Sequence, residues 1–302
     1  MNRRWTNSTA GERTKKRVDA PERRKENKRS KIFACLFSCA FLSVCSLQTY
    51  AQDTLRTGKV ITNAQMVGIG SINQLDTYLS PGEYRGSELR YVSHSVRENG
   101  SKISRELIHQ AHLSLTRNRA ENNREIGGLY NFQYNVQYEL GEWQLGNGRL
   151  MLKAGGGVDA NIGFLYNTRN GNNPAQAYVN LNLAPNATAA YRFRLWNRPF
   201  QIRYEMQLPL VGLMYAPNFG QSYYEIFSKG DYDHNIVPTT IGSAPSLRQM
   251  LTFDFSISHT TVRLGYLGDF QQAKVNGLKY HTWSNLFVVG IVRKFSITKI
   301  LP

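Results

Sequence analysis

The sequence predicts an all-β protein, a transmembrane antiparallel up-and-down β-barrel of about ten strands, on the strength of three observations. Apolar and polar residues alternate with a period of two in segment after segment from Ala64 onward. These segments are about ten to eighteen residues long, whereas strands of soluble sheets are usually nearer five or six. Short turns and longer connections alternate between them, as the two ends of a membrane barrel require. Because only a closed barrel pairs every strand in hydrocarbon, the pattern favours a barrel over a secreted β-sandwich.

The alternation places the strands one by one. In the clearest segment Leu251, Phe253, Phe255 and Ile257 alternate with polar residues. Ten strands are expected at residues 64–74, 87–97, 103–117, 125–140, 149–166, 176–195, 199–215, 248–258, 261–270 and 279–297. The first two segments alternate poorly, so eight or twelve strands remain open. An even number of strands places the first and the last residue of the barrel segment, residues 64–297, on the same side, which we expect to be the periplasm.

The first 51 residues have the order of a secretory signal peptide. Residues 1–31 carry 12 Lys and Arg against 4 Asp and Glu, and Ile32–Leu47 is an uncharged apolar run that leads to the small residue Ala51. The run is shorter than the roughly 20 residues that a membrane-spanning helix needs. We therefore expect cleavage after Ala51, with a retained anchor as the alternative. Residues 52–63 would form a short periplasmic lead-in, and residues 298–302 a C-terminal tail.

The charge and the cysteine positions limit which ligands and partner molecules the sequence predicts. The chain has 37 Lys and Arg against 21 Asp and Glu, and its three cysteines all lie in the apolar run of the leader. The mature chain would therefore have no thiol for a disulfide, a nucleophile or a metal site. Its basic residues are spread over strands and turns, which argues against nucleic acid and favours attraction to lipopolysaccharide. We expect an outer-membrane protein in contact with lipid, lipopolysaccharide and the barrel-assembly machinery, with no cofactor and no metal.

The strand register also predicts which charged residues face the lumen. They are Glu106, Glu139, Arg149, Lys153, Asp159, Arg192, Arg194, Arg203, Glu205, Asp254, Arg263 and Asp269. A ten-stranded barrel is narrow enough for side chains to fill most of its interior. Because both signs occur, we interpret these residues as a paired network that plugs the lumen, in a protein with a structural or ligand-binding role. A narrow, anion-leaning transport pore is the alternative.

A third possibility is an outer-membrane hydrolase that acts on lipid or peptide. His112 and Ser114 lie two apart on one strand, as a nucleophile and its base do in lipid-directed enzymes of this class. Here Leu113 and Leu115 take the lipid face, which turns His112 and Ser114 inward and favours a polar lumen lining. His234 follows Asp233 in the longest connection, but no second carboxylate site accompanies the pair, so loop polarity explains them more simply.

One loop segment is distinctive enough to be a ligand-binding candidate. It consists of Gln221, Ser222, Tyr223, Tyr224 and Glu225. Two tyrosines beside a carboxylate can stack on and hydrogen-bond a sugar or a peptide. The simpler interpretation is a loop that folds over the barrel mouth, or an aromatic girdle at the membrane interface.

Three stretches carry a resemblance to a known family. They are Asn172–Pro174, PLVGLMYAPNFGQSYYEIF at Pro209–Phe227 and LGYLGDFQQAKVNGLKYHTWSNLFVVGIVRKF at Leu264–Phe295. Together they resemble a domain-of-unknown-function family of outer-membrane β-barrel proteins from Bacteroides-type bacteria. The resemblance covers most of the mature chain. It implies a location and an architecture, and it brings no activity with it.

Overall fold

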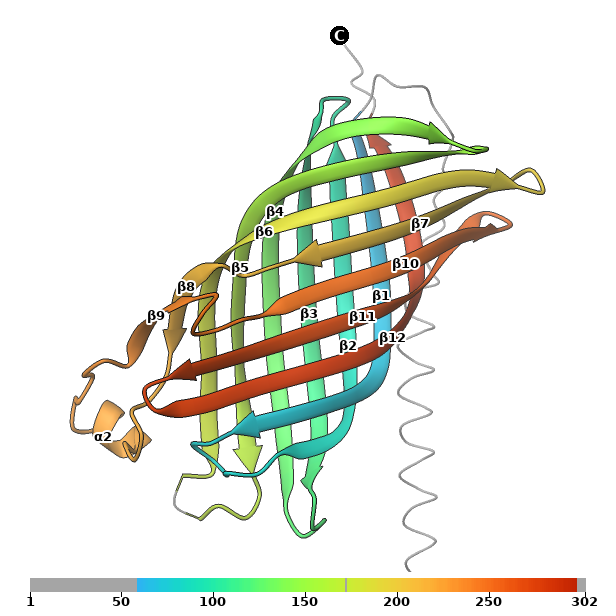
Figure 1. Ribbon diagram of the computed structural model, residues 1–302. Coiled ribbons are helices and arrows are strands. Elements are labelled where there is room, and N and C mark those ends of the chain that lie inside the picture. The colour runs from blue at the N-terminus through green and yellow to red at the C-terminus, as the bar shows by residue number, and fades with distance from the viewer. Residues whose placement is uncertain (1–58, 172, 298–302) are drawn as a thin grey trace, which may run out of the picture. The chain divides into compact units, whose positions relative to one another are not determined.

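The computed structural model describes residues 59–171 and 173–297, which form a closed antiparallel barrel (Figure 1). Consecutive strands pair around the wall, which closes where β1 pairs with β12. The elements are β1 (Lys59–Asp76), β2 (Tyr84–Glu98), β3 (Ile103–Asn118), β4 (Arg124–Leu145), β5 (Gly148–Asn167), β6 (Ala175–Leu195), β7 (Arg198–Gln207), β8 (Val211–Tyr215), α2 (Tyr223–Phe227), β9 (Ile236–Thr240), β10 (Leu247–Ile257), β11 (Thr260–Val275) and β12 (Leu278–Ile297). In the part of the chain described, no helix is long and apolar enough to cross a membrane. The predicted signal peptide and C-terminal tail lie outside the described residues.

Two of the ten barrel strands are each built from two pieces. β7 and β8 both pair with β6, and the hydrogen bonding continues between them, because Leu208 N and Leu210 N donate to the carbonyl oxygens of Pro185 and Leu183 at 3.0 Å each. Pro209 has no N–H for the other edge of this strand, where the pairing with β10 ends at Gln207 and the pairing with β9 begins at Val211. β9 pairs with β8 and β10 pairs with β7, so these two pieces form the next strand. The predicted ten-stranded barrel is confirmed.

The connections differ from the prediction at two places at one end of the barrel. Residues 216–247, expected as a loop, contain α2 and β9. The expected loop at 271–277 is mostly strand, because β11 continues to Val275 and turns at Asn276 and Gly277. Both turn residues have positive φ, 49° and 74°, as a tight type I′ hairpin requires, and Asn-Gly is the sequence that such turns prefer. The strict alternation of short and long connections is therefore wrong at this hairpin.

Two strand boundaries also differ from the prediction. β4 continues through the predicted turn at 141–148 as far as Leu145, after a bulge between Glu139 and Gly141. The extra residue of a bulge shifts the alternation by one, which hides the continuation of the strand in the sequence. β1 begins at Lys59, five residues before the expected start at Ala64.

The outer face of the barrel is apolar. Large apolar side chains are exposed on strands all around the wall, including Ile69, Leu89, Leu113, Leu115, Ile162, Phe164, Leu181, Leu183, Leu251 and Phe287. Exposed apolar surface on this scale is rare on a soluble monomer. With every strand paired and the polar side chains turned inward, it is the arrangement of a transmembrane β-barrel.

The two ends of the barrel are distinct. The turn end carries the short connections at 99–102, 146–147, 196–197 and 258–259, and the strands β1 and β12 begin and end there. The loop end carries the longer connections and α2 (Figure 1). Near the turn end, the rings of Tyr191, Phe193, Phe200, Phe253 and Phe255 form a stacked row across β6, β7 and β10, with successive centroids 5.4–5.7 Å apart. Such rows are typical of the aromatic girdle at a membrane interface.

Part of the barrel interior is an apolar core. It is formed by side chains of β1, β2, β3, β10, β11 and β12 and consists of Ala64, Met66, Val92, Ile108, Met250, Leu267, Leu286, Val288 and Val292. On β12 the neighbours Phe287 and Val289 are exposed while Leu286 and Val288 are buried, so this strand is apolar on both faces. A second, smaller apolar cluster consists of Tyr178, Met214, Ala216, Ala273 and Val275, and much of the remaining interior is polar.

Candidate functional site: the lumen and its two mouths

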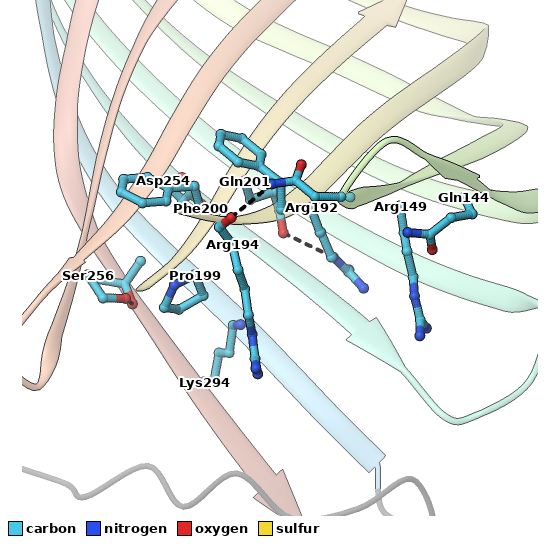
Figure 2. A pocket seen from close by; sticks show the side chains of 14 residues that line it. Gln144, Arg149, Arg192, Arg194, Pro199, Phe200, Gln201, Asp254, Ser256 and Lys294 are labelled. Atoms are coloured by element: carbon cyan, nitrogen blue, oxygen red, sulfur yellow. Dashed lines mark hydrogen bonds between the residues drawn. The ribbon is translucent and has the colours of Figure 1, made fainter. Parts of the chain in front are cut away.

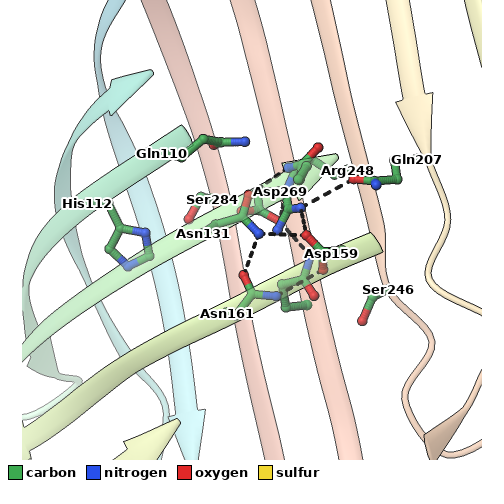
Figure 3. A network of polar contacts seen from close by, with 12 residues as sticks. Gln110, His112, Asn131, Asp159, Asn161, Gln207, Ser246, Arg248, Asp269 and Ser284 are labelled. Carbon is green, nitrogen blue, oxygen red and sulfur yellow. Dashed lines mark hydrogen bonds and ion pairs between the residues drawn. The ribbon is translucent and has the colours of Figure 1, made fainter. Parts of the chain in front are cut away.

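The middle of the lumen is crossed by an ion network that joins opposite walls of the barrel. Arg90 is 2% exposed, and its Nε donates to Glu88 Oε1 at 2.6 Å while its Nη1 donates to Asp269 Oδ2 at 2.7 Å. Arg248 Nη1 donates to Asp159 Oδ1 at 2.7 Å, and its Nε lies 3.2 Å from Asp269 Oδ1. Asp269 therefore bridges two arginines that come from β2 and β10, and Figure 3 shows Asp269 beside Arg248. We call these five residues the lumen plug.

Side-chain amides complete the lumen plug. Asp159 is fully buried, and it accepts from Asn131 Nδ2 at 2.6 Å, from Asn161 Nδ2 at 2.9 Å and from Asn182 Nδ2 at 3.4 Å. Figure 3 shows Asp159 beside Asn161 of the same strand, β5, and beside Asn131 of the neighbouring strand, β4. Arg248 reaches Asp159 from β10. Because buried charges are stable only when they are paired and hydrogen-bonded, this arrangement holds the interior in one conformation.

A second ion cluster lies between the lumen plug and the turn end. Arg203 Nη2 donates to Glu106 Oε1 at 2.8 Å, and its Nε donates to Glu205. His94 Nε2 lies 2.6 Å from the same Glu106 oxygen. His94, Glu106 and Glu205 place one ligand atom each within 4.8 Å of one another, a spacing that a metal ion could bridge. Arg203 already donates to both carboxylates, however, so the cluster is accounted for as an ion network.

Little free volume remains around these networks. The described interior holds cavities of about 40 Å³, lined by Glu106, Gln133 and Arg248, and about 20 Å³, lined by Gln74 and His112. Each has room for about one to a few water molecules. The polar side chains therefore fill this narrow part of the barrel.

The barrel opens into a wide cavity at the turn end, which we call the vestibule (Figure 2). Its volume is about 580 Å³. The strand register places Arg149 opposite Arg192, Arg192 opposite Gln201, and Gln201 opposite Asp254, so these four residues form one row on the inner face. Directly opposed residues of an antiparallel pair share a face of the sheet.

The charges of the vestibule are mostly basic. Its lining includes Arg149, Arg192, Arg194 and Lys294, and its only described acidic residue is Asp254. Both oxygens of that carboxylate are bound by Arg263, at 2.7 and 2.8 Å.

The basic side chains of the vestibule have few partners. Arg192 Nε donates to Gln201 Oε1 at 3.2 Å, and Arg149 approaches Glu142 only to 3.8 Å. Within the described residues, the side chains of Arg194 and Lys294 make no hydrogen bond or ion pair.

The predicted lumen charges are thus divided between two places. Glu106, Lys153, Asp159, Arg203, Glu205 and Asp269 lie in the narrow interior, whereas Arg149, Arg192, Arg194 and Asp254, with its partner Arg263, belong to the vestibule. Glu139 lies at the bulge of β4. Glu88, Arg90 and Arg248 were missed in the sequence analysis, although they share the even-numbered positions of their strands with inward-facing residues. That parity is the signal that could have found them.

The predicted catalytic residues do not come together. His112 and Ser114 are buried and face inward, as their strand position predicts, but each has a different partner. His112 Nδ1 lies 3.2 Å from Arg90 Nη2, and Ser114 Oγ donates to Gln74 Oε1 at 3.3 Å. His234 lies in an exposed loop, where its Nδ1 is 2.5 Å from Asp233 Oδ1.

The loop-end candidates are used mainly for folding the loop. Ser222 caps α2 in a capping box with Glu225, and Gln221 is buried where it accepts from Asn235 Nδ2 at 2.7 Å. The Ser222 backbone amide lowers the pKa of Glu225 by binding its carboxylate. Tyr223 accepts from Ala177 N at 2.7 Å, and burial raises its pKa. Of the five predicted residues only Tyr224 is exposed, at 65%.

One family model matches the chain, over residues 32–300, and it is described as "Protein of unknown function (DUF3316)". The chain belongs to this family. The match spans the barrel and the whole of the ion network described above. No curated protein matches the sequence.

Several solved structures are similar to this DUF3316 barrel. The transport unit of the autotransporter AIDA-I from Escherichia coli is 7% identical, with 84% of this chain and 94% of that chain covered and a TM-score of 0.43. The outer membrane protease OmpT from Escherichia coli is 8% identical, with 83% and 99% covered and a TM-score of 0.41. An outer membrane channel from Pseudomonas putida F1 is 10% identical, with 82% and 100% covered and a TM-score of 0.33.

Proposed function

We propose that this protein is an outer-membrane barrel that its own side chains close, with a structural or ligand-binding role. The observation that carries the proposal is the lumen plug, in which Asp269 bridges Arg90 and Arg248 across the interior. Moving an ion through this region requires breaking buried charge pairs, and that leaves uncompensated charges at a high cost. The apolar outer face and the polar interior support the location in a lipid bilayer.

The proposal includes an orientation and surroundings. Membrane barrels of this kind have short turns on the periplasmic side and longer loops outside. The turn end, with the vestibule, would then face the periplasm, and α2 would face the exterior. Outer-membrane lipid and lipopolysaccharide would surround the wall, and the barrel-assembly machinery would insert it.

Conductance in a planar lipid bilayer tests the closed lumen. The wild-type barrel is expected to give no discrete current steps. A double variant, Asp159→Ser with Arg248→Ser, removes one acid and one base together and shortens both side chains, so it should open a path and give steps. Discrete steps from the wild type would overturn the proposal.

A narrow anion-leaning pore remains the second candidate, because the vestibule is basic at Arg149, Arg192, Arg194 and Lys294. In that case the wild type conducts, and Arg192→Gln reduces its preference for anions over cations. The reversal potential under a salt gradient measures that preference. The same recording therefore decides between the two candidates.

A further inference from the structure

We propose that the vestibule binds a small ligand that carries at least two anionic groups, phosphate or carboxylate. This inference rests on the proposed ligand-binding role and names its site. The cavity of about 580 Å³ lies in the range of 300–1,000 Å³ that is typical of small-molecule sites. It is also far larger than the cavities of about 40 and 20 Å³ in the narrow interior.

The charge of the lining indicates an anion. Arg149, Arg192, Arg194 and Lys294 face one acidic residue, and Arg263 already binds both oxygens of that residue, Asp254. A ligand anion would therefore meet four basic groups and no free carboxylate among the described lining residues. Arginine suits this task, because its planar fork binds phosphate or carboxylate through two parallel hydrogen bonds.

The spacing of the arginines indicates more than one anionic group. Arg149 and Arg192 stand directly opposite each other on β5 and β6, and Arg194 follows two residues along on the same face. Like charges in opposed positions are destabilising. An anion bound between Arg149 and Arg192 would therefore reduce the repulsion between their side chains. Opposed positions are about 5 Å apart and positions two residues along a strand about 7 Å apart. Two anionic groups at a similar separation would match these three side chains.

Neutral groups in the vestibule would assist the binding. Gln144, Asn147 and Gln201 contribute amide side chains to the lining, and Pro199 contributes apolar surface. Figure 2 shows the side chains of Arg149, Arg192 and Arg194 extending in the same direction, with Lys294 beside Arg194 in this view. The lining thus offers charged and amide contacts to a ligand, with the ring of Pro199 as an apolar contact.

Calorimetric titration of the full-length barrel, folded in an uncharged detergent, tests the inference. Pyrophosphate and citrate are the probes, with two phosphates and three carboxylates respectively, and inorganic phosphate is the control with a single phosphate. We expect the two larger anions to bind at least tenfold more tightly than inorganic phosphate, and their affinity to fall as salt is raised, since exposed charges are screened. Equal affinities for all three would overturn the inference.

Matched variants locate the binding. Arg192→Gln with Arg194→Gln should weaken the binding of pyrophosphate or citrate at least tenfold. Arg119→Gln, which removes one exposed charge at the loop end, should leave it unchanged. The heat-dependent shift in gel mobility checks that each variant is folded. Equal loss in all variants, or none in any, would contradict a vestibule site. Neither result would alter the conductance test of the closed lumen.

Discussion

The narrow interior and the vestibule contain the same kinds of charged side chain in opposite circumstances. Arg90 and Arg248 are 2% and 5% exposed, and carboxylates and amides surround them. Arg192 and Arg194 are exposed, and a single glutamine is the only side-chain partner of the pair within the described chain. Burial makes an unpaired charge costly, whereas water tolerates it. Pairing therefore marks the interior arginines as structural, and the lack of it leaves the vestibule arginines available to a ligand.

The largest expected loss of stability comes from replacing a buried arginine of the narrow interior. Arg90→Gln leaves Glu88 without its ion pair and deprives Asp269 of one of two arginines. Breaking a buried pair in this way costs about 3–5 kcal/mol. Urea unfolding of the barrel in lipid vesicles, followed by tryptophan fluorescence, measures the loss.

Two controls sharpen that result. Arg194→Gln makes the same substitution in the vestibule and should change the free energy of unfolding by less than about 0.5 kcal/mol. Adding Glu88→Gln to Arg90→Gln removes the carboxylate that would otherwise stay buried without its arginine, and it should restore much of the stability. If Arg90→Gln and Arg194→Gln are equally harmful, the distinction between the two regions is wrong.

The wall of the barrel was predictable because lipid and lumen impose opposite chemistry on alternate residues. The prediction was weakest for β1 and β2, and the structure gives the reason. The inner face of this region is part of the apolar core, with Ala64, Met66 and Val92 turned inward, so polar and apolar positions no longer alternate. β9 was missed because it has only five residues, Ile236–Thr240, with a proline in the middle.

The ion pairs were not predictable, although the inward faces were. Arg90 and Asp269 are 179 residues apart in the sequence, and Arg203 and Glu106 are 97 apart. Alternation assigns each side chain to a face, but only the register and tilt of the closed barrel decide which groups meet. The vestibule was hidden for the same reason, because it depends on how far the strands extend past one another at the turn end.

The next effect tests the two faces of the wall at adjacent residues of β10. Phe253 belongs to the stacked aromatic row outside, and Asp254 pairs with Arg263 in the vestibule. Phe253→Arg is expected to destabilise the barrel by up to about 2–4 kcal/mol, since a basic residue on the lipid face is costly near the midplane and less so toward the interface. Asp254→Asn should be milder, because asparagine keeps the size of the side chain and an oxygen that accepts from Arg263, and the vestibule cavity lies beside this otherwise buried pair. Urea unfolding and the folded fraction on unboiled gels compare them, and equal tolerance would contradict the assignment of faces.

The smallest effect is expected at the loop end, where a charge is used neither for the lumen plug nor for the vestibule. Glu225 closes the capping box of α2, where its carboxylate accepts from the Ser222 backbone amide and its pKa is lowered as a result. Glutamine at this position would offer a neutral amide oxygen, to which the same backbone amide donates less strongly. Glu225→Gln should therefore loosen α2 and leave the barrel unchanged. Trypsin cleavage after the exposed Lys229 should become a few-fold faster, as mass spectrometry of the fragments would detect. Asp233→Asn removes an equal charge from the same loop outside the cap and should have no such effect. Faster cleavage in both variants would mean that loop charge, and not the cap, protects this segment.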